Sequence, residues 1–165
     1  MVEPERFAER YGPWALVAGA SEGLGAAYAR ALAVRGLRLV LVARRADPLQ
    51  RLAADLRARH GIEVRCIVGD LADAATVARL AEEASRIDIG LLVYNAAHAP
   101  VGDFSAVEAA GLQRVVDVNV RGPVLLARAV LPGMAARGSG GIVLMSSLAG
   151  NQGTARIAAY AASKA

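Results

Sequence analysis

Short apolar segments alternate with longer amphipathic segments along most of the chain. Five of the apolar segments are continuously hydrophobic instead of alternating with polar residues, which is typical of strands covered on both faces in a parallel sheet. We predict these strands at residues Trp14–Gly19, Leu37–Ala43, Glu63–Gly69, Ile89–Asn95 and Gly141–Ser147.

Between these strands, apolar residues recur at helical spacing on one face of each segment. The first three such stripes run through Leu24–Leu32, Leu49–Leu56 and Val77–Ala84. Asp47 and Pro48 are predicted to cap the second helix and to occupy its first position, while Gly36 and Gly61 stand where helices end. A last helix is predicted to start at about Arg156.

A fourth helix is predicted from about Ser105 to Ala136, and it carries a polar residue on its apolar stripe. Asn119 continues the stripe of Leu112 and Val115, and Pro123 follows four residues later. Proline has no N–H to donate, so we predict a kink with the carbonyl of Asn119 left free. This pair of polar groups favours an anchor for an ordered water, although a neighbouring loop can also satisfy a buried asparagine.

The alternation of strands and helices predicts an α/β fold, a Rossmann-type doubly wound parallel sheet in three α/β/α layers. The 165 residues are expected to form a single domain, with residues 1–12 as an N-terminal extension. The last helix begins fewer than ten residues before Ala165 and has no room to finish, and the sheet is expected to be incomplete because it ends at its fifth strand with an open apolar edge. We therefore expect the sequence to be truncated at its C-terminus.

Composition narrows the possible classes of function. The formal net charge is +4, but the basic residues are scattered singly along the helices, which argues against nucleic-acid binding. Residues 1–10 carry alternating charges and lack the apolar stretch of a signal peptide, and the longest charge-free stretch, 138–155, is too polar to span a membrane. A single cysteine, Cys66, fits a core thiol in a cytoplasmic protein. We predict no metal site.

A glycine-rich turn follows the first predicted strand and leads directly into the first helix. Its residues are Gly19-Ala20-Ser21-Glu22-Gly23-Leu24-Gly25, a GxxxGxG spacing. Glycine lets backbone amides approach a pyrophosphate closely, and the amino end of a helix attracts an anion. Such turns also serve as plain connections, but this position between strand and helix favours dinucleotide binding.

The end of the second predicted strand indicates which dinucleotide is bound. An acidic residue there would bind the ribose 2′-hydroxyl and repel a 2′-phosphate. The sequence instead reads Ala43-Arg44-Arg45, without a carboxylate. Because arginine binds phosphate through paired charge-assisted hydrogen bonds, Arg44 predicts NADP(H) in preference to NAD(H). Arg45 fits either this role or a solvated surface position.

Three residues near the end of the chain form a candidate catalytic group. Tyr160 and Lys164 lie four residues apart, on one face of a helix, and Lys164 is the only lysine among 19 basic residues. A phenol with its ordinary pKa of about 10 is a poor acid–base catalyst at neutral pH, and a nearby ammonium lowers that pKa. Ser147 follows the fifth predicted strand, where a hydroxyl can hydrogen-bond a substrate carbonyl.

Over nearly its whole length the sequence resembles the short-chain dehydrogenases/reductases. The resemblance rests on Gly19-x-x-x-Gly23-x-Gly25, Asp70-Leu71, Asn95-Ala96-Ala97, Asn119, Ser147 and Tyr160-x-x-x-Lys164. It implies that Tyr160 is the acid–base and that Ser147 polarises the carbonyl. It also implies that Lys164 holds the nicotinamide ribose and tunes the tyrosine, and that Asn119 positions a water in a proton relay.

The same resemblance, together with the glycine turn and Arg44, implies a set of cofactor-binding residues. In that set Asp70 meets the adenine, and Asn95 supports the sheet and lines the cofactor cleft. The expected set is Gly19, Ser21, Gly23, Leu24, Gly25, Arg44, Asp70, Leu71, Asn95, Ala96, Tyr160 and Lys164.

The function implied is an NADP(H)-dependent oxidoreductase that transfers hydride between the nicotinamide and a carbonyl or secondary alcohol. Residues 11–17 and 88–93 look most like the branch of 3-ketoacyl reductases and 17β-hydroxysteroid dehydrogenases, and the parent protein is expected to be a homo-oligomer. The alternative is a catalytically incompetent fragment or a non-catalytic NADP-binding protein on the same fold.

The sequence departs from the family pattern at three positions near the expected cofactor. Ala18 replaces a threonine, Tyr94 stands where a second asparagine is common, and Ala97 replaces a glycine. These changes put cofactor affinity in doubt more than the chemistry. His98, which follows them, is either a residue that touches a substrate or an exposed loop residue, and the second is the expectation.

Overall fold

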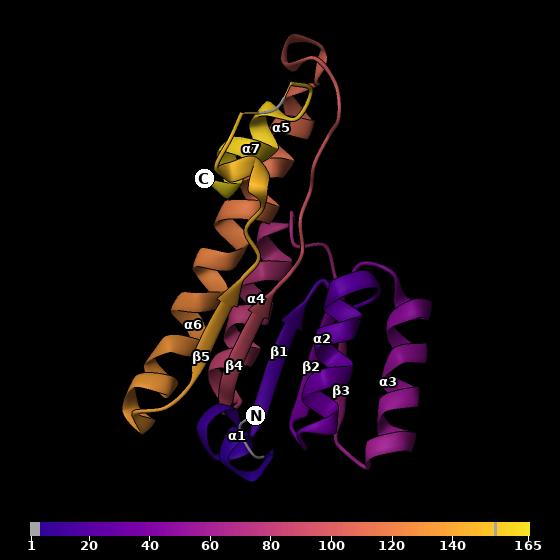
Figure 1. The fold of residues 1–165 in the computed structure, drawn as a ribbon, viewed down its shortest axis with the longest axis vertical. Coiled ribbons are helices and arrows are strands. Elements are labelled where there is room, and N and C mark those ends of the chain that lie inside the picture. The colour runs from indigo at the N-terminus through magenta and orange to yellow at the C-terminus, as the bar shows by residue number, and fades with distance from the viewer. Residues whose placement is uncertain (1–3, 154) are drawn as a thin grey trace.

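The computed structural model of the protein describes residues 4–153 and 155–165. Its centre is a five-stranded sheet in the order β3-β2-β1-β4-β5, in which every neighbouring pair is parallel (Figure 1). The strands are β1 (Trp14–Ala18), β2 (Arg38–Ala43), β3 (Val64–Val68), β4 (Ile89–Tyr94) and β5 (Gly141–Leu144). This arrangement confirms the predicted Rossmann-type fold.

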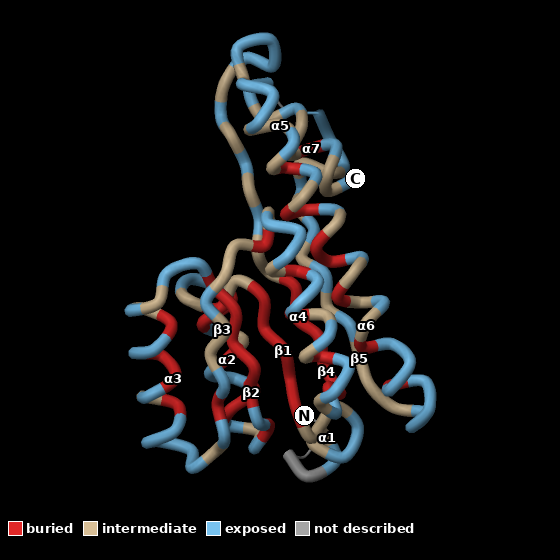
Figure 2. Tube along the Cα trace, turned by 180° about the vertical axis from the view of Figure 1, so that it is seen from behind, coloured by how far each residue is buried: buried red, intermediate tan, exposed pale blue. Residues whose placement is uncertain are grey.

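Helices cover both faces of the sheet, so the fold has three layers (Figures 1 and 2). One face packs against α2 (Gly23–Val34) and α3 (Ala46–His60), and the other against α4 (Ala74–Arg86) and α6 (Gly122–Arg137). The remaining elements are α1 (Pro4–Tyr11), η1 (Phe104–Ala106), α5 (Ala109–Val116), η2 (Asp117–Arg121), η3 (Leu148–Gly150) and α7 (Ala158–Lys164). Within the described part of the chain, none of the helices combines the length and the apolarity that crossing a bilayer requires.

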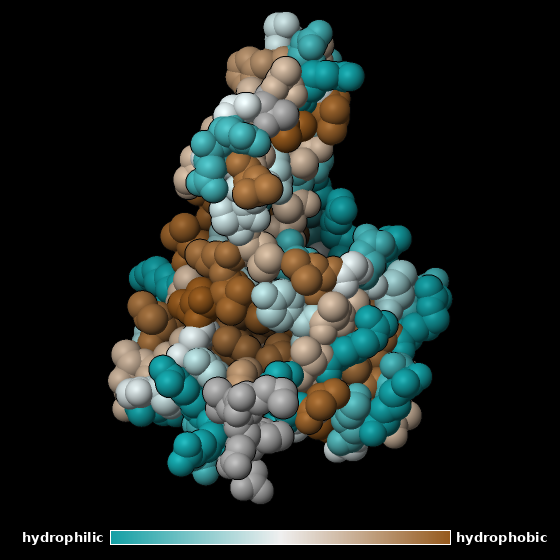
Figure 3. Space-filling view, viewed as in Figure 1, coloured by the Kyte–Doolittle hydropathy of each residue, from teal (hydrophilic) through white to brown (hydrophobic). Residues whose placement is uncertain are grey.

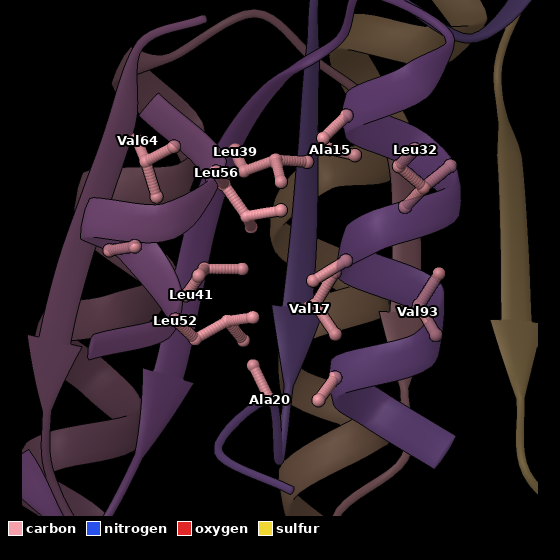
Figure 4. Close-up of a cluster of buried hydrophobic side chains, with 14 of the residues drawn as sticks. Ala15, Val17, Ala20, Leu32, Leu39, Leu41, Leu52, Leu56, Val64 and Val93 are labelled. Atoms are coloured by element: carbon pink, nitrogen blue, oxygen red, sulfur yellow. The ribbon is translucent and has the colours of Figure 1, made fainter. Parts of the chain in front are cut away.

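Side chains alternate along each central strand, so each strand contributes to the hydrophobic cores on both faces of the sheet. In β1, Val17 points to the layer of α2 and α3, while its neighbour Leu16 points to the layer of α4 and α6, and both are fully buried. Figure 4 shows Val17 in one cluster with Leu32 of α2, Leu41 of β2 and Leu52 of α3. Burying each such leucine stabilises the fold by about 1.5–3 kcal/mol.

The two outer strands are less buried than the central ones. β5 forms one edge, and its Leu144 side chain is 55% exposed although β4, its neighbour, is buried throughout. Figure 3 shows hydrophobic side chains gathered over the middle of this face of the molecule, where β5 lies in Figure 1. At the other edge, Cys66 of β3 is half-buried against the layer of α2 and α3.

Several predicted boundaries are wrong by a few residues. The strands are shorter than predicted; β1, for example, ends before Gly19, whose φ of +83° is outside the extended region. Helix α3 begins at Ala46 with Arg45 as its N-cap, so Asp47 lies inside the first turn. The last helix begins at Ala158, because Arg156 has a left-handed φ of 68° that no helix accepts.

The predicted helix from Ser105 to Ala136 begins four residues later and contains a π turn. It starts at Ala109, and in η2 the amide of Gly122 donates to the carbonyl of Asp117, five residues back. In this register the partner of Val118 would be Pro123, which has no N–H. The carbonyl that loses its donor is therefore that of Val118, whereas the sequence had indicated Asn119.

Tyr94 replaces the missing donor. Its buried hydroxyl donates to the carbonyl of Val118 at 2.6 Å, and burial raises the pKa of Tyr94 so that it stays protonated. Gly122 provides the room for this bond, because a Cβ there would lie 2.3 Å from the Tyr94 hydroxyl oxygen. Tyr94, Val118 and Gly122 thus act together to hold the π turn that carries Asn119.

We expect Gly122→Ala and Tyr94→Phe each to lower the free energy of unfolding by about 1–3 kcal/mol, the first by overpacking and the second by leaving the Val118 carbonyl unpaired. The double variant should lose less than the sum, because the two changes remove the same contact. Urea unfolding midpoints measure these effects. Gly153→Ala is the control, since Gly153 is exposed and an added Cβ there would meet nothing within 4 Å, so it should change the midpoint little. Full additivity would contradict the shared contact.

Candidate active site

A cleft of about 310 Å³ opens at the carboxyl ends of the strands, where the segments after β1 to β4 meet. Seven of the residues predicted to bind the cofactor line it: Gly19, Ser21, Arg44, Asp70, Leu71, Asn95 and Ala96. Gly23, Leu24 and Gly25 form the start of α2 behind this lining. The cleft also contains Glu22, His98, Arg114 and Val118, among others, which the sequence did not assign to cofactor binding.

The glycine turn packs so closely that Gly25 has no room for a side chain. A Cβ on Gly25 would lie 2.0 Å from the carbonyl oxygen of Gly19, and the side-chain amide of Asn95 donates to that same oxygen at 3.2 Å. Gly23 is different: it has a φ of +54°, and a Cβ there would meet nothing within 4 Å. The turn is therefore closely packed at Gly25, whereas the space beside Gly23 is open.

The amino end of α2 is suited to a phosphate. Its N-cap residue, Glu22, makes no side-chain hydrogen bond to the helix, and the first turn contains no acidic residue. The leading amides of a helix have no partner within the helix, and its dipole is positive at this end. The open space over Gly23 and these uncapped amides fit the pyrophosphate of a dinucleotide.

The two arginines after β2 have different surroundings. Arg45 pairs with Glu22, with 2.5 Å between Nη2 and Oε2, and both side chains are exposed. Arg44 lines the cleft, whereas Arg45 is not among the lining residues. The geometry therefore leaves Arg44 as the guanidinium available to a ligand in the cleft.

Asp70 is held at the cleft wall by two groups. The amide of Ala72 donates to its Oδ1 at 3.0 Å, and Nη2 of Arg114 donates to Oδ1 at 2.9 Å and to Oδ2 at 2.7 Å. Burial by itself raises the pKa of Asp70. The amide and guanidinium bonds outweigh burial and hold that pKa below its usual range, so the group is a carboxylate at neutral pH.

Asn119 is buried and its side chain is fully engaged. Its Oδ1 accepts from the amide of His98 at 2.8 Å, while Nδ2 donates to the carbonyl of His98 at 3.0 Å and to Oγ of Ser163 at 2.8 Å. The side chain thus joins η2 to the loop after β4 and to α7, as the alternative from the sequence allowed. The role of Asn119 in a proton relay stays a prediction.

His98 differs from its expected exposed position. It is half-buried and lines the cleft, and burial lowers its pKa, as do the nearby Arg114 and Arg44 against the opposite effect of Asp70. The imidazole is therefore largely neutral at pH 7.

The structure brings only part of the predicted tetrad together. Lys164 and Asn119 line a second cavity of about 210 Å³, where Nζ of Lys164 donates to the carbonyl of Met145 at 2.6 Å. Burial lowers the pKa of Lys164. Nζ lies 5.8 Å from the ring centroid of Tyr160, on the neighbouring turn of α7. Ser147 caps η3, accepting from the amide of Ala149 at 3.2 Å, and neither it nor Tyr160 lines this cavity.

Comparison with known families gives the cleft its context. Residues 13–165 match the family model described as short chain dehydrogenase. The chain belongs to the short-chain dehydrogenase family. This membership confirms the resemblance seen in the sequence, and it places the glycine turn, Asp70, Asn95 and the segment from Ser147 to Lys164 within one matched region.

Individual short-chain dehydrogenase relatives agree. The human "Inactive hydroxysteroid dehydrogenase-like protein 1" is 36% identical over 160 residues, covering 95% of this chain and 48% of that protein. The 7beta-hydroxysteroid dehydrogenase of Clostridium sardiniense is 34% identical over 159 residues, covering 96% and 61%. The chain thus spans about half to three fifths of the length of these relatives.

A solved structure shows the same fold with a ligand. The short-chain dehydrogenase from Sphingobium yanoikuyae, solved in complex with NADPH, superposes with a TM-score of 0.89 at 37% identity. The match covers 93% of this chain and 60% of that one.

Arg114 and Ser163 are the contacts that sequence reasoning missed. Arg114 lies five residues before Asn119, but reaches Asp70 of a segment 44 residues away. Ser163 lies beside Lys164 and accepts from Asn119 across the same distance in sequence. Helical spacing places both residues on their helices, yet only the packing of α5 and α7 against other elements reveals their partners.

We expect Gly25→Ala to destabilise the short-chain dehydrogenase fold by about 1–3 kcal/mol, because the added methyl would overlap the Gly19 carbonyl. It should also abolish dinucleotide binding, since relief of the overlap must move the turn or α2. Gly153→Ala is the control, because Gly153 is exposed and a Cβ there meets nothing within 4 Å. Thermal melting and NADPH titration measure both effects. Unchanged melting of Gly25→Ala would contradict the close packing.

Proposed function

We propose that this protein is an NADP(H)-dependent oxidoreductase that interconverts a ketone and a secondary alcohol. The observation that carries the proposal is the cleft itself: an open glycine turn, uncapped helix amides and Arg44 lie at one edge of the sheet. The cavity of Asn119 and Lys164 lies at the end of β5 on the same edge. An anion site beside an ammonium in a half-buried cavity suits a nicotinamide dinucleotide.

In the proposed reaction Tyr160, Ser147 and Lys164 each have a separate role. When bound, the nicotinamide supplies the hydride that reduces the carbonyl carbon. The Tyr160 hydroxyl gives its proton to the carbonyl oxygen, which Ser147 polarises by hydrogen bonding. Lys164 favours the tyrosinate that this leaves and binds the nicotinamide ribose. Its ammonium donates to the Met145 carbonyl at the end of β5, and this position supports the proposed role.

The substrate proposed is a ketone of the 3-ketoacyl or steroid type. The name of the Clostridium relative, a 7beta-hydroxysteroid dehydrogenase, supports testing steroid ketones first. Whole-protein assembly is proposed to be homo-oligomeric. Exposed apolar residues on the outer side of the α5–α6 helix support this, namely Val116, Val120, Val124 and Leu131.

A second candidate is an NADP-binding protein without turnover. The similarity to proteins named as inactive favours it, as does the position of Ser147 and Tyr160 outside the lining of the Lys164 cavity. The two candidates share the dinucleotide cleft and differ only in catalysis, so binding and turnover must be measured separately.

Arg44→Ala should weaken NADPH binding by about 10-fold to 100-fold and leave NADH binding nearly unchanged, because the charge-assisted hydrogen bonds that it removes go only to the 2′-phosphate. Fluorescence titration with both cofactors measures the effect. Arg45→Ala is the matched control, since Arg45 is paired with Glu22, and its NADPH affinity should change little. An equal loss for both cofactors in Arg44→Ala would refute the phosphate role.

Tyr160→Phe should abolish NADPH-dependent reduction of a ketone while NADPH binding stays intact, because only the transferable proton is removed. Steady-state absorbance at 340 nm and the titration above measure the two properties. Tyr28→Phe serves as the control, since Tyr28 lies half-buried in α2, away from both cavities, and should keep full turnover. Full activity in Tyr160→Phe would overturn the assignment. NADPH binding without turnover in the unaltered protein would establish the second candidate.

A further inference from the structure

We propose that Tyr94 is a positioning residue, which fixes Lys164 at the end of β5 through a closed ring of hydrogen bonds. The ring runs through Tyr94, Val118, Asn119, Ser163, Lys164 and Met145. The proposal deepens the proposed function and rests on it for the role of Lys164. The ring itself is a property of the chain, so it can be tested without a substrate.

The side chain of Tyr94 makes the first half of the ring. Its hydroxyl donates to the carbonyl of Val118 at 2.6 Å, in the π turn that also carries Asn119. Nδ2 of Asn119 donates to Oγ of Ser163 at 2.8 Å, and Ser163 directly precedes Lys164 in α7. The hydroxyl of Tyr94 is thereby connected to the backbone of the lysine.

The backbone of Tyr94 makes the second half of the ring. Tyr94 is the last residue of β4, and its carbonyl accepts from the amide of Met145 at 3.1 Å. The carbonyl of Met145 in turn accepts from Nζ of Lys164 at 2.6 Å. Two routes therefore lead from Tyr94 to Lys164, one to its backbone and the other to its ammonium.

The ring also reaches the second member of the proposed catalytic pair. The hydroxyl of Ser163 accepts from Asn119 and donates to the carbonyl of Tyr160 at 2.7 Å. Nζ of Lys164 lies 5.8 Å from the ring centroid of Tyr160. The contacts that hold Lys164 therefore also hold the turn of α7 that carries Tyr160.

Burial makes the ring hard for water to replace. Tyr94 and Asn119 are 3% and 6% exposed, and both line the cavity of Lys164. Buried polar groups depend on their protein partners, so the loss of one link should disturb the next. Because burial lowers the pKa of Lys164, that pKa reports how closely the cavity is packed around the ammonium.

A purely local role for Tyr94 is the alternative. Asn119 is also held by the amide and the carbonyl of His98. If these two bonds were enough, removal of the Tyr94 hydroxyl would weaken the π turn and leave Asn119 and Lys164 in place. The surroundings of Lys164 therefore distinguish a positioning residue from one that only stabilises the fold.

The test uses the fact that Lys164 is the only lysine of the chain. Protein made with isotopically labelled lysine gives a single ε-methylene NMR signal, and its shift with pH measures the pKa of Lys164. Tyr94→Phe removes only the hydroxyl and opens the ring. The pKa of Lys164 should then rise toward its ordinary value, because the ammonium becomes better hydrated.

Two further variants act on the ring from other positions. Gly122→Ala should give the same rise, because its added Cβ would overlap the Tyr94 hydroxyl, although Gly122 does not line the cavity of Lys164. Combined with Tyr94→Phe it should add little, since both changes break the same bond. Ser163→Ala removes the link from Asn119 and carries the comparison if melting shows that the other variants fail to fold.

Tyr28→Phe is the matched control, because Tyr28 is half-buried in α2 and lines neither cavity, so the pKa of Lys164 should not change. Reduction of a steroid ketone by NADPH adds a kinetic readout. In Tyr94→Phe kcat should fall about 10-fold while KM for the ketone stays within about threefold, because Tyr94 acts through Lys164 and not on the substrate.

The outcomes are distinguishable. A folded Tyr94→Phe protein with an unchanged Lys164 pKa overturns the inference and leaves the proposed function standing. So does an equal rise in Tyr28→Phe, or full additivity of Tyr94→Phe and Gly122→Ala. An unaltered protein that binds NADPH but reduces no ketone overturns the proposed oxidoreductase, while the lysine signal still decides whether the ring exists.

Discussion

Parallel strands impose one constraint on which the rest of this structure depends: the carboxyl ends of all five strands point to the same edge of the sheet. The glycine turn, Arg44, the Asp70 loop and the Asn95 loop are far apart in sequence, yet each begins where a strand ends. Burial of both sheet faces fixes the strands in their order and register. The core that fixes the strands therefore also brings the lining of the cleft together.

The charges around the cleft are arranged so that one arginine is left for a ligand. Arg45 is paired with Glu22, Arg114 with Asp70 and Arg121 with Asp117. Arg44 lines the cleft without an ion pair among the described residues. The pairing concentrates unbalanced positive charge next to the uncapped amides of α2, where a phosphate would meet both.

The π turn contributes a residue to each of the two cavities: Val118 lines the cleft, and Asn119 lines the cavity of Lys164. Tyr94 supplies the donor that Pro123 cannot give to Val118, and this holds Asn119 toward the loop after β4 and toward Ser163 of α7. Tyr94, which departs from the family pattern, therefore has a structural consequence. The tyrosine bridges β4 and the helix here. An asparagine side chain is shorter, so the hydrogen bond to Val118 depends on the tyrosine at this position.

The sequence by itself determined the three layers, the parallel sheet and the glycine turn, because these follow from local periodicity and from residues whose backbone preferences are strong. It also placed Gly19, Arg44, Asp70 and Asn95 at strand ends, and these meet at the cleft. The identity of the freed carbonyl, the pairing of Arg114 with Asp70 and the hold of Asn119 on His98 were decided only by tertiary structure. Each depends on the register of a helix turn or on contacts between segments more than 20 residues apart, which no local pattern encodes.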